Sequence, residues 1–194
     1  MMQSHIGDTL DQVELLHLAM RASQEGNEGA AIAYLKDAVG RKDATAAAHL
    51  LLGAEYAQVK LFDRAITEMQ IAVTMEPALS IARLELGMLC VATNDNVRAV
   101  EAFSVLSELA ADDYFHWFGA GMLQLIENNT AEAFRLLSQA MIMNTNNPNL
   151  NATFANIIDS IGSENLTQQA SASPGARSEV QLDSRLGAYF GINV

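Results

Sequence analysis

The sequence predicts an all-α fold, a solenoid of about four helical hairpins followed by a C-terminal capping helix. Two ladders of small residues share one period of about 34 residues, a length typical of helical-hairpin repeats. The first ladder is Ala31, Ala65, Ala99 and Ala133, and the second is Ala19, Gly53, Gly87 and Gly121. Around these positions the apolar residues follow the period of amphipathic helices. A fixed repeat of this kind is typical of stacked units that bury a continuous core.

Two further ladders keep the same register, and together the four explain how the helices can pack. One contains Ala38, Ala72, Leu106 and Ala140, and the other contains the bulky residues Leu35, Met69, Phe103 and Leu137. Where two helices cross, a large side chain would hold the axes apart, so Ala or Gly at the crossing lets large neighbours interlock around it. We therefore expect Gly53, Ala65, Gly87, Ala99, Gly121 and Ala133 to have a structural role.

The first unit, near residues 12–45, contains two amphipathic stretches separated by a turn at Glu25-Gly26-Asn27. The second unit covers residues 46–79. The third and fourth, residues 80–113 and 114–147, have polar breaks at Asn94-Asp95-Asn96 and Asn128-Asn129-Thr130. Residues that stop one helix and start the next separate the units. These are Lys42-Asp43, Glu76-Pro77, Asp112-Asp113 and Asn146-Asn147-Pro148.

The two ends of the chain differ from the repeats. Residues 148–162 keep the repeat phase for one more helix, through Phe154, Ala155, Ile158 and Gly162, and we expect this helix to be the terminal cap. Residues 1–11 form an N-terminal segment. Residues 163–194 are expected to be a flexible tail, because much of this stretch is rich in Gln, Ser and Ala. The tail ends in an apolar run, Leu186 to Val194, which we expect to dock on a protein surface.

This repeat pattern resembles the tetratricopeptide repeat (TPR) family, whose signature is W-x-x-L-G-x-x-Y followed by Ala, an aromatic residue, Ala and Pro. The second unit matches best, with Leu52-Gly53, Tyr56, Ala65, Ala72 and Pro77 in place. In the third unit Cys90 replaces the tyrosine and Ala111 the proline, in the fourth Gln124 stands at the tyrosine position, and the first unit is degenerate. The resemblance covers roughly residues 12–162 and implies a concave binding face lined by the first helix of each hairpin.

Composition excludes several kinds of partner. The chain has 11 Lys and Arg against 23 Asp and Glu, a formal net charge of -12, which disfavours nucleic acid and anionic lipid. No apolar run approaches the length of a membrane span, so we expect no membrane insertion. The single cysteine cannot form an internal disulfide, and residues 1–11 do not look like a signal peptide. These features predict a cytoplasmic protein.

Catalytic groups are not arranged in any pattern that indicates an enzyme. Cys90 replaces a packing tyrosine on an apolar helix, where a thiol behaves as a small hydrophobe. The four histidines are scattered without metal-ligand spacing, and the glycines form no phosphate-binding loop. We therefore predict no enzymatic activity, no cofactor and no metal. His17 and His49 are expected to be polar contacts at most.

The concave face implied by the resemblance is apolar. At the groove-lining positions of TPR proteins the second unit has Ala47, Leu50, Leu51 and Ala54, and the third has Ile81, Leu84, Glu85 and Met88. The fourth has Phe115, Phe118 and Met122. Methionine and aromatic side chains repack around varied apolar ligands. The predicted partner-binding residues are Leu50, Ile81, Leu84, Met88, Phe115, Phe118 and Met122; the alternative is that some of them pack internally.

The apolar groove separates this chain from TPR proteins that clamp a C-terminal carboxylate with Lys, Arg and Asn. Leu16, Leu50, Leu84 and Phe118 occupy one such clamp position in the four units. Small size, acidity and an apolar groove are instead similar to the class II chaperones of bacterial type III secretion. The run Asp112 to Gly121 is similar in character to the aspartate-aromatic-glycine run of their repeats.

The sequence therefore predicts a non-catalytic adaptor or chaperone that binds a peptide or protein segment in an apolar groove. We expect Leu84→Glu or Phe118→Glu to abolish ligand binding while helicity is kept. One alternative is a self-associating scaffold, such as a homodimer, or a regulatory subunit of a larger assembly. Another is autoinhibition, in which Leu186 to Val194 occupies the groove of its own chain until a partner displaces it.

Overall fold

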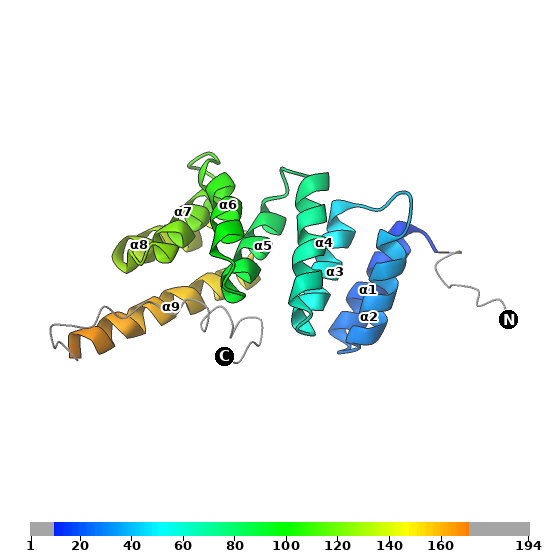
Figure 1. Ribbon diagram of the computed structural model, residues 1–194, viewed down its shortest axis with the longest axis horizontal. Coiled ribbons are helices and arrows are strands. Elements are labelled where there is room, and N and C mark those ends of the chain that lie inside the picture. Colours follow the sequence, from blue (N-terminus) through cyan, green and yellow to red (C-terminus); the bar gives the residue numbers. More distant parts are fainter. Residues whose placement is uncertain (1–9, 171–194) are drawn as a thin grey trace. The chain divides into compact units, whose positions relative to one another are not determined.

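The computed structural model describes residues 10–170, with side chains described as far as Ile161, and every regular element in that range is an α-helix (Figure 1). The predicted all-α class is confirmed. The helices are α1 (Gln12–Gln24), α2 (Glu28–Val39), α3 (Ala46–Gln58), α4 (Phe62–Met75), α5 (Ser80–Ala92), α6 (Asn96–Ser107), α7 (Tyr114–Ile126), α8 (Thr130–Met143) and α9 (Pro148–Ala170).

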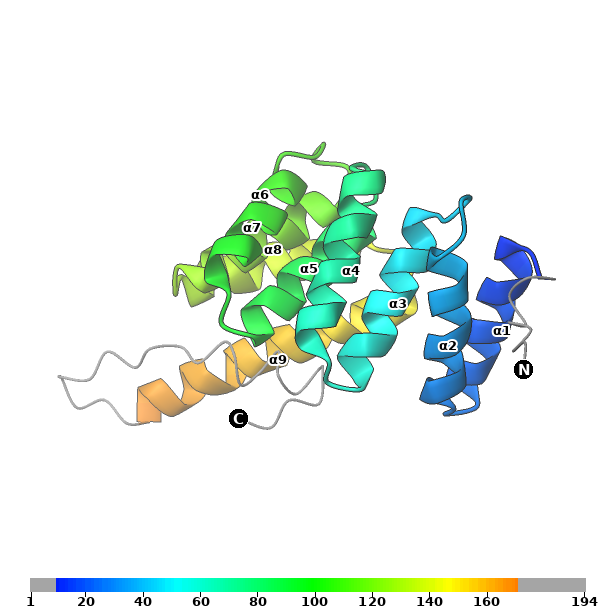
Figure 2. The same ribbon diagram turned by 45° about the vertical axis from the view of Figure 1, so that its right-hand side comes forward.

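The chain divides into two compact units, with the boundary between Glu85 and Leu86, inside α5. In the first unit α1 pairs with α2, α3 pairs with α4, and α2 packs on α3 (Figures 1 and 2). In the second unit α6 packs on α7, α7 pairs with α8, and α8 packs on α9. Helix pairs joined by short turns therefore repeat along each unit.

The turns inside the four hairpins have the same backbone conformation. Gly26, Lys60, Asn94 and Asn128 have φ values of 71°, 63°, 61° and 62°, and each stands one full repeat after the one before it. In each turn the amide of the next residue donates to the carbonyl five residues back, as from Leu61 N to Tyr56 O at 2.8 Å. This is the Schellman ending of a helix, in which a left-handed residue satisfies the last carbonyls and reverses the chain.

Polar side chains start several of the helices. Asp11 and Glu14 form a capping box, with 2.8 Å hydrogen bonds in both directions between side chains and backbone amides. Thr45 caps α3 by accepting from the amide of Ala48. Asn27, Asp95 and Asp113 cap α2, α6 and α7 in a similar way. Each cap satisfies an amide that has no partner within the helix, so the polar breaks seen in the sequence also set the helix starts.

The small-residue ladders mark the closest helix approaches within the hairpins. A Cβ atom at Gly53 would lie 2.8 Å from Met69 Cγ, and one at Gly87 would lie 2.6 Å from Phe103 Cε1. At Gly121 it would lie 2.8 Å from Leu137 Cγ. The glycine ladder therefore packs directly on the bulky ladder, while Ala31, Ala65, Ala99 and Ala133 are fully buried.

The capping helix is longer than the sequence suggested. Its expected end was residue 162, but α9 continues to Ala170. Residues 163–170 contain neither Pro nor Gly, so nothing in them stops a helix that has begun. Residues 1–9 and 171–194, including the apolar run from Leu186 to Val194, lie outside the described residues.

Candidate protein-binding face

The predicted binding residues lie on one side of α3, α5 and α7, the first helices of the last three hairpins, and this side is here called the first-helix face. It comprises positions 13, 16, 17 and 20 of α1 and the positions equivalent to them by the repeat in α3, α5 and α7. In each helix the four positions follow the spacing that places residues on one side of an α-helix. The repeat therefore presents the same face four times with different side chains.

In the first unit this face is apolar and partly uncovered. Val13 and Met20 of α1 have 60% and 47% of their side-chain surface exposed, and Leu16, Leu50 and Leu51 are half-buried. Leu16 packs against a core cluster that includes Ala48 of α3. Gln12 Nε2 also donates to Thr45 Oγ1 at 3.3 Å, which ties the start of α1 to the start of α3. These contacts place α1 beside α3, so the exposed residues of α1 and the half-buried leucines of α3 lie on neighbouring helices.

The other predicted residues divide into two groups. Ile81 of α5 and Phe115 of α7 are half-buried, as Leu50 is. Leu84, Met88, Phe118 and Met122 have no exposed surface at all. A ligand cannot reach these four side chains in this state of the chain, so they are core residues here, which is the alternative that the sequence left open.

Phe118 is enclosed by aromatic side chains of two neighbouring helices. Its ring stacks on Phe154 of α9, with centroids 4.6 Å apart and planes 22° apart. Its edge meets Phe103 of α6, with centroids 6.0 Å apart. Tyr114 of α7 also approaches Phe154, at 6.5 Å. Helix α9 therefore covers the part of the fourth hairpin that the sequence assigned to a ligand, and Phe118→Glu would place a charge in the core.

The start of α7 is an aromatic segment that is only partly buried. Tyr114 and Phe115 stack with ring centroids 4.3 Å apart. Trp117 Nε1 donates to the carbonyl of Ala111 at 2.8 Å, and the Trp117 ring meets His116 edge-on. These contacts are local, so the segment closes the loop that precedes α7.

The titratable residues of the apolar helices include two with raised pKa values and one histidine in contact with a carboxylate. Burial raises the pKa of the Cys90 thiol to about 11, so the nucleophilic thiolate is disfavoured at neutral pH. His49 Nδ1 lies 2.7 Å from Glu68 Oε2, a contact between α3 and α4. His17 is exposed. Burial also raises the pKa of Glu85, on the first-helix face of α5, to about 7.

Within the described range no three His, Cys, Asp or Glu residues are grouped so that they could hold a metal ion. Between residues 10 and 170 there is also no helix with the length and apolar character needed to cross a membrane.

Sequence reasoning missed Val13 and Met20, the most exposed apolar residues of the first-helix face. The available signal was the repeat phase, because Val13 and Met20 stand one repeat before Ala47 and Ala54, which were assigned to the groove. Leu16 stands at the clamp position of the same degenerate unit, between Val13 and Met20.

The comparisons with known proteins agree with the helical-repeat fold. Neither a family model nor a curated protein sequence matches the chain. A crystal structure of MamA is similar with a TM-score of 0.57 and 20% identity, over 69% of this chain and 78% of that one. A MamA structure from Desulfovibrio magneticus RS-1, described as residue 41 to the end, has a TM-score of 0.59 and 12% identity, over 83% and 89% of the two chains.

At these identities the likeness concerns the fold alone. The chain is therefore an all-α, TPR-like solenoid, as the sequence predicted. These neighbours lend no support to the similarity with type III secretion chaperones, which stays a prediction from the sequence.

Proposed function

We propose that the chain is a non-catalytic protein-interaction adaptor, and that it binds an apolar peptide or protein segment on the first-helix face of α1 and α3. The observation that carries this proposal is the exposure of Val13 and Met20 beside half-buried Leu16 and Leu50. Phe118, the equivalent of Leu16 and Leu50 in the fourth hairpin, is fully buried and stacked on Phe154 of α9, whereas the exposed large apolar residues of the repeated face, Val13 and Met20, lie on α1.

The chemistry of this face fits an apolar segment. Methionine adapts its three side-chain torsions to different partners, and leucine offers branched apolar surface. Burial of about 300 Å² of apolar surface at roughly 25 cal/mol per Å² supplies a favourable term of several kcal/mol before ordering costs. Binding in the micromolar range would follow from a few such anchors.

Met20 and Met75 offer a matched pair for the test. Both are methionines with 47% exposed surface, but Met20 lies on the first-helix face of α1 and Met75 ends the second helix of the next hairpin, α4. We would capture partners from a lysate of the source cells with the wild type, Met20→Glu and Met75→Glu, and identify them by mass spectrometry. Helicity by circular dichroism would confirm that both variants fold.

The proposal requires that one or more proteins disappear from the Met20→Glu sample and stay with Met75→Glu. If both variants retain the same proteins as the wild type, the first-helix face does not bind partners. Re-binding of a recovered protein to purified chain, and its competition by a peptide from that protein, would then define the segment.

Two narrower functions belong to the same proposal. A chaperone role would require that the bound segment aggregates without this chain, which light scattering of the recovered partner measures directly. Self-association into a homodimer or larger scaffold predicts a mass that rises with concentration in sedimentation velocity. A constant monomeric mass over a wide concentration range would exclude the scaffold.

A further inference from the structure

Helix α6 carries apolar residues on its solvent-exposed side that the hairpin does not bury. Val97 has 80% of its surface exposed, and Val100 and Val105 about half as much, at 40% and 39%. Glu101 and Glu108 are exposed on the same side. These five residues follow the three- and four-residue steps of one helix face, and we call them the outer stripe.

The repeat does not require a large apolar residue at the most exposed position of the outer stripe. At the position of Val97 the other hairpins have Gly29, Asp63 and Ala131. Packing therefore needs no large apolar side chain there. Val100 stands one repeat after Ile66, which is 4% exposed, so the same position is core in one hairpin and surface in the next. Val97, at 80% exposed, therefore buries little of its surface in the described part of the chain.

The second half of the described chain contains few basic residues. Between residues 86 and 170 the only Lys or Arg side chains are Arg98 and Arg135. Arg98 pairs with Asp95, and Arg135 Nε donates to Glu132 Oε2 at 2.9 Å. Each arginine holds the pKa of its partner carboxyl below the usual range. Both cations are thus bonded to acidic neighbours.

Glu101 and Glu108 are in a different position. Within the described part of the chain neither carboxylate has an ion pair or hydrogen bond. The stripe therefore offers three valines flanked by two carboxylates whose charge is not compensated. Nucleic acid and anionic lipid would be repelled by this surface. A partner that presents apolar residues flanked by Lys or Arg would bury the valines and pair with the carboxylates.

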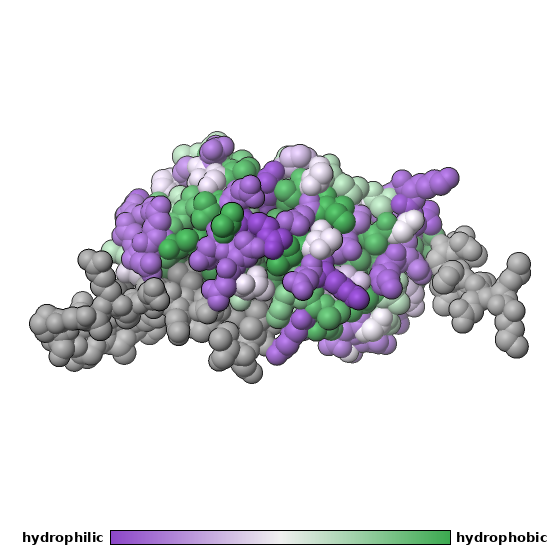
Figure 3. Space-filling model, in the orientation of Figure 1, coloured by the Kyte–Doolittle hydropathy of each residue, from purple (hydrophilic) through white to green (hydrophobic). Residues whose placement is uncertain are grey.

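We propose that the outer stripe binds a basic amphipathic helix of a partner protein, at a site separate from the first-helix face. A helix is the expected shape, because the stripe follows one face of a helix and its residues are spaced to interlock with side chains of a second helix packed along it. Figure 3 shows hydrophobic residues between hydrophilic ones on the side of the molecule where α6 lies in Figure 1.

The test uses two synthetic helical peptides of about 14 residues, four turns long. Both carry leucine at every third or fourth position, and the flanking residues are lysine in one peptide and glutamate in the other. Their binding to the full chain would be measured by fluorescence anisotropy at about 50 mM and about 300 mM NaCl, which span strong and weak electrostatic interaction. The variants are Val97→Ser, the double variant Glu101→Lys/Glu108→Lys, and two controls.

The controls separate the stripe from other apolar surfaces. Ile71→Ser removes an exposed apolar side chain at the α4 position equivalent to Val105, where the same-face neighbours are Thr67, Glu68, Thr74 and Met75. Met20→Glu alters the first-helix face. Circular dichroism of each variant confirms that the helices are kept.

We expect the wild type to prefer the lysine peptide, and Val97→Ser to weaken that binding about five- to tenfold, as expected for the lost burial of a valine. The double charge reversal should transfer the preference to the glutamate peptide, and high salt should reduce it. Equal binding of both peptides, or an equal loss in Ile71→Ser, would overturn the proposal. Loss in Met20→Glu alone would place the peptide on the first-helix face, which would overturn the outer stripe and leave the proposed function standing.

Discussion

At the scale of single residues, some of the turns can be recognised from their amino acids and one cannot. Asn94 and Asn128 stand in left-handed turns, and asparagine tolerates that conformation better than most residues. Gly26 pays no steric penalty at all. Lys60 has the same backbone conformation with φ of 63°, although lysine has no preference for it. The sequence pattern therefore indicated three of the turns by composition, and only the repeat period locates the one at Lys60.

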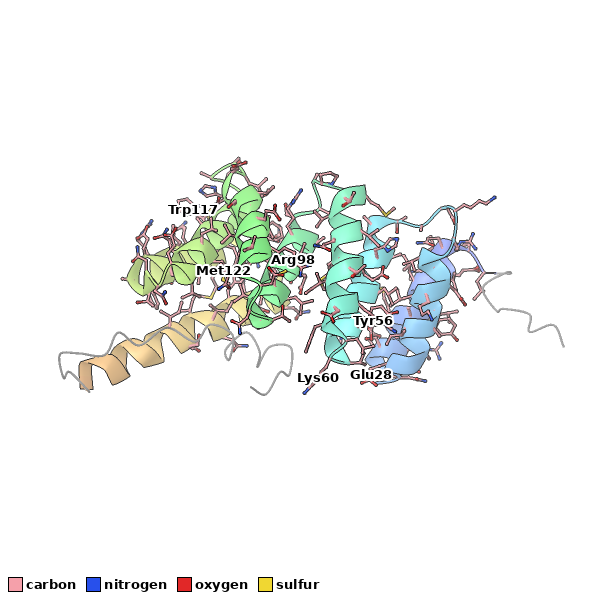
Figure 4. All side chains as sticks on the ribbon, viewed as in Figure 1. Glu28, Tyr56, Lys60, Arg98, Trp117 and Met122 are labelled. Carbon is pink, nitrogen blue, oxygen red and sulfur yellow. The ribbon has the colours of Figure 1, made fainter. Side chains whose placement is uncertain are left out.

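Lys60→Gly is expected to raise the free energy of unfolding by about 0.5–1 kcal/mol. Removal of the Cβ relieves a left-handed conformation that costs roughly 1–2 kcal/mol, and the greater freedom of glycine in the unfolded chain offsets part of the gain. The side chain points away from the helices in Figure 4, so no packing is lost. Urea unfolding measures the change. Lys60→Ala keeps the Cβ and is the control; an equal gain in both variants would show that the lysine side chain, and not its backbone, is unfavourable.

The raised pKa of Glu85 predicts a stability that depends on pH. Burial places the pKa at about 7 in the folded chain, against an ordinary 4.5. Between these two values the folded state binds more protons than the unfolded state, so the free energy of unfolding falls as pH rises and levels off above about 7. The total loss is about 1–3 kcal/mol for a half-buried carboxyl.

Glu85→Gln should therefore flatten this part of the pH profile and stabilise the chain at pH 8, as measured by urea unfolding between pH 5 and 8, the range in which a pKa near 7 titrates. Glu101→Gln changes an exposed carboxyl and serves as the comparison. If both variants keep the slope of the wild type, the pH dependence has another origin.

At the scale of helices, one close approach is made to the backbone of a neighbouring helix. A Cβ atom at Gly119 would lie 2.7 Å from the carbonyl oxygen of Phe103 and 2.9 Å from the amide nitrogen of Ser107. At Gly53, by contrast, the nearest atom belongs to the flexible side chain of Met69. The sequence revealed Gly53 through its ladder but did not reveal Gly119, because that glycine stands outside the glycine ladder, where the other hairpins have His17, Leu51 and Glu85.

Gly119→Ala is expected to destabilise the chain by about 3 kcal/mol, near the upper end for an overpacked site, because α6 and α7 would have to separate. Gly53→Ala should cost about 1 kcal/mol, since Met69 can change rotamer. Thermal and urea unfolding of the two variants give the comparison. In Gly29→Ala the added Cβ meets nothing closer than 3.9 Å and should stabilise α2 slightly. A loss for Gly53→Ala as large as that for Gly119→Ala would contradict the distinction between side-chain and backbone contact.

The packing of α9 is a second case in which helix contacts decide the interpretation of a sequence pattern. The repeat phase assigns Phe118 and Met122 to the first-helix face, but phase alone cannot say whether another helix covers that face. The coverage of Phe118 depends on where Phe154 lies after the chain turns at residues 144–147. Asn144 helps to fix that turn, since its Nδ2 donates to Asn151 Oδ1 and to the carbonyl of Asn147, both at 3.0 Å.

Phe154→Ala is therefore expected to loosen α9 and to cost about 3–5 kcal/mol, as for other fully buried aromatic residues. Hydrogen exchange should quicken in α9, and the Phe118 site should become accessible to an apolar dye. Phe134→Ala on α8 removes an aromatic residue that is 44% exposed and should change neither readout. Unchanged exchange in α9 of Phe154→Ala would mean that the stacked rings do not hold this helix.

At the scale of the whole molecule, the repeat made the fold predictable and left the binding face only partly so. Four ladders with one period predict the order of the helices and the contacts inside each hairpin, because the ladder positions meet the same kind of partner in each hairpin. The exposure of a face depends instead on the helix after the last repeat, which supplies Phe154, and on residues that depart from the pattern, such as Val97. Each such departure occurs in one hairpin only, so the repeat period cannot predict it.

The acidity of the chain gives a prediction at this scale. With a formal net charge of -12, carboxylates repel one another in the compact state more than in the expanded unfolded chain. Sodium chloride up to about 0.3 M shortens the Debye length to below about 8 Å and should therefore raise the unfolding temperature, by about 2–4 °C if the relief amounts to about 1 kcal/mol. The Glu101→Lys/Glu108→Lys variant carries less negative charge, so its unfolding temperature should start higher and respond less to salt. Differential scanning calorimetry at several salt concentrations tests both effects.

An unfolding temperature that falls with salt would mean that attraction outweighs the general repulsion, because screening weakens both alike. The attraction would come from the ion pairs of Arg21, Arg41, Arg98 and Arg135.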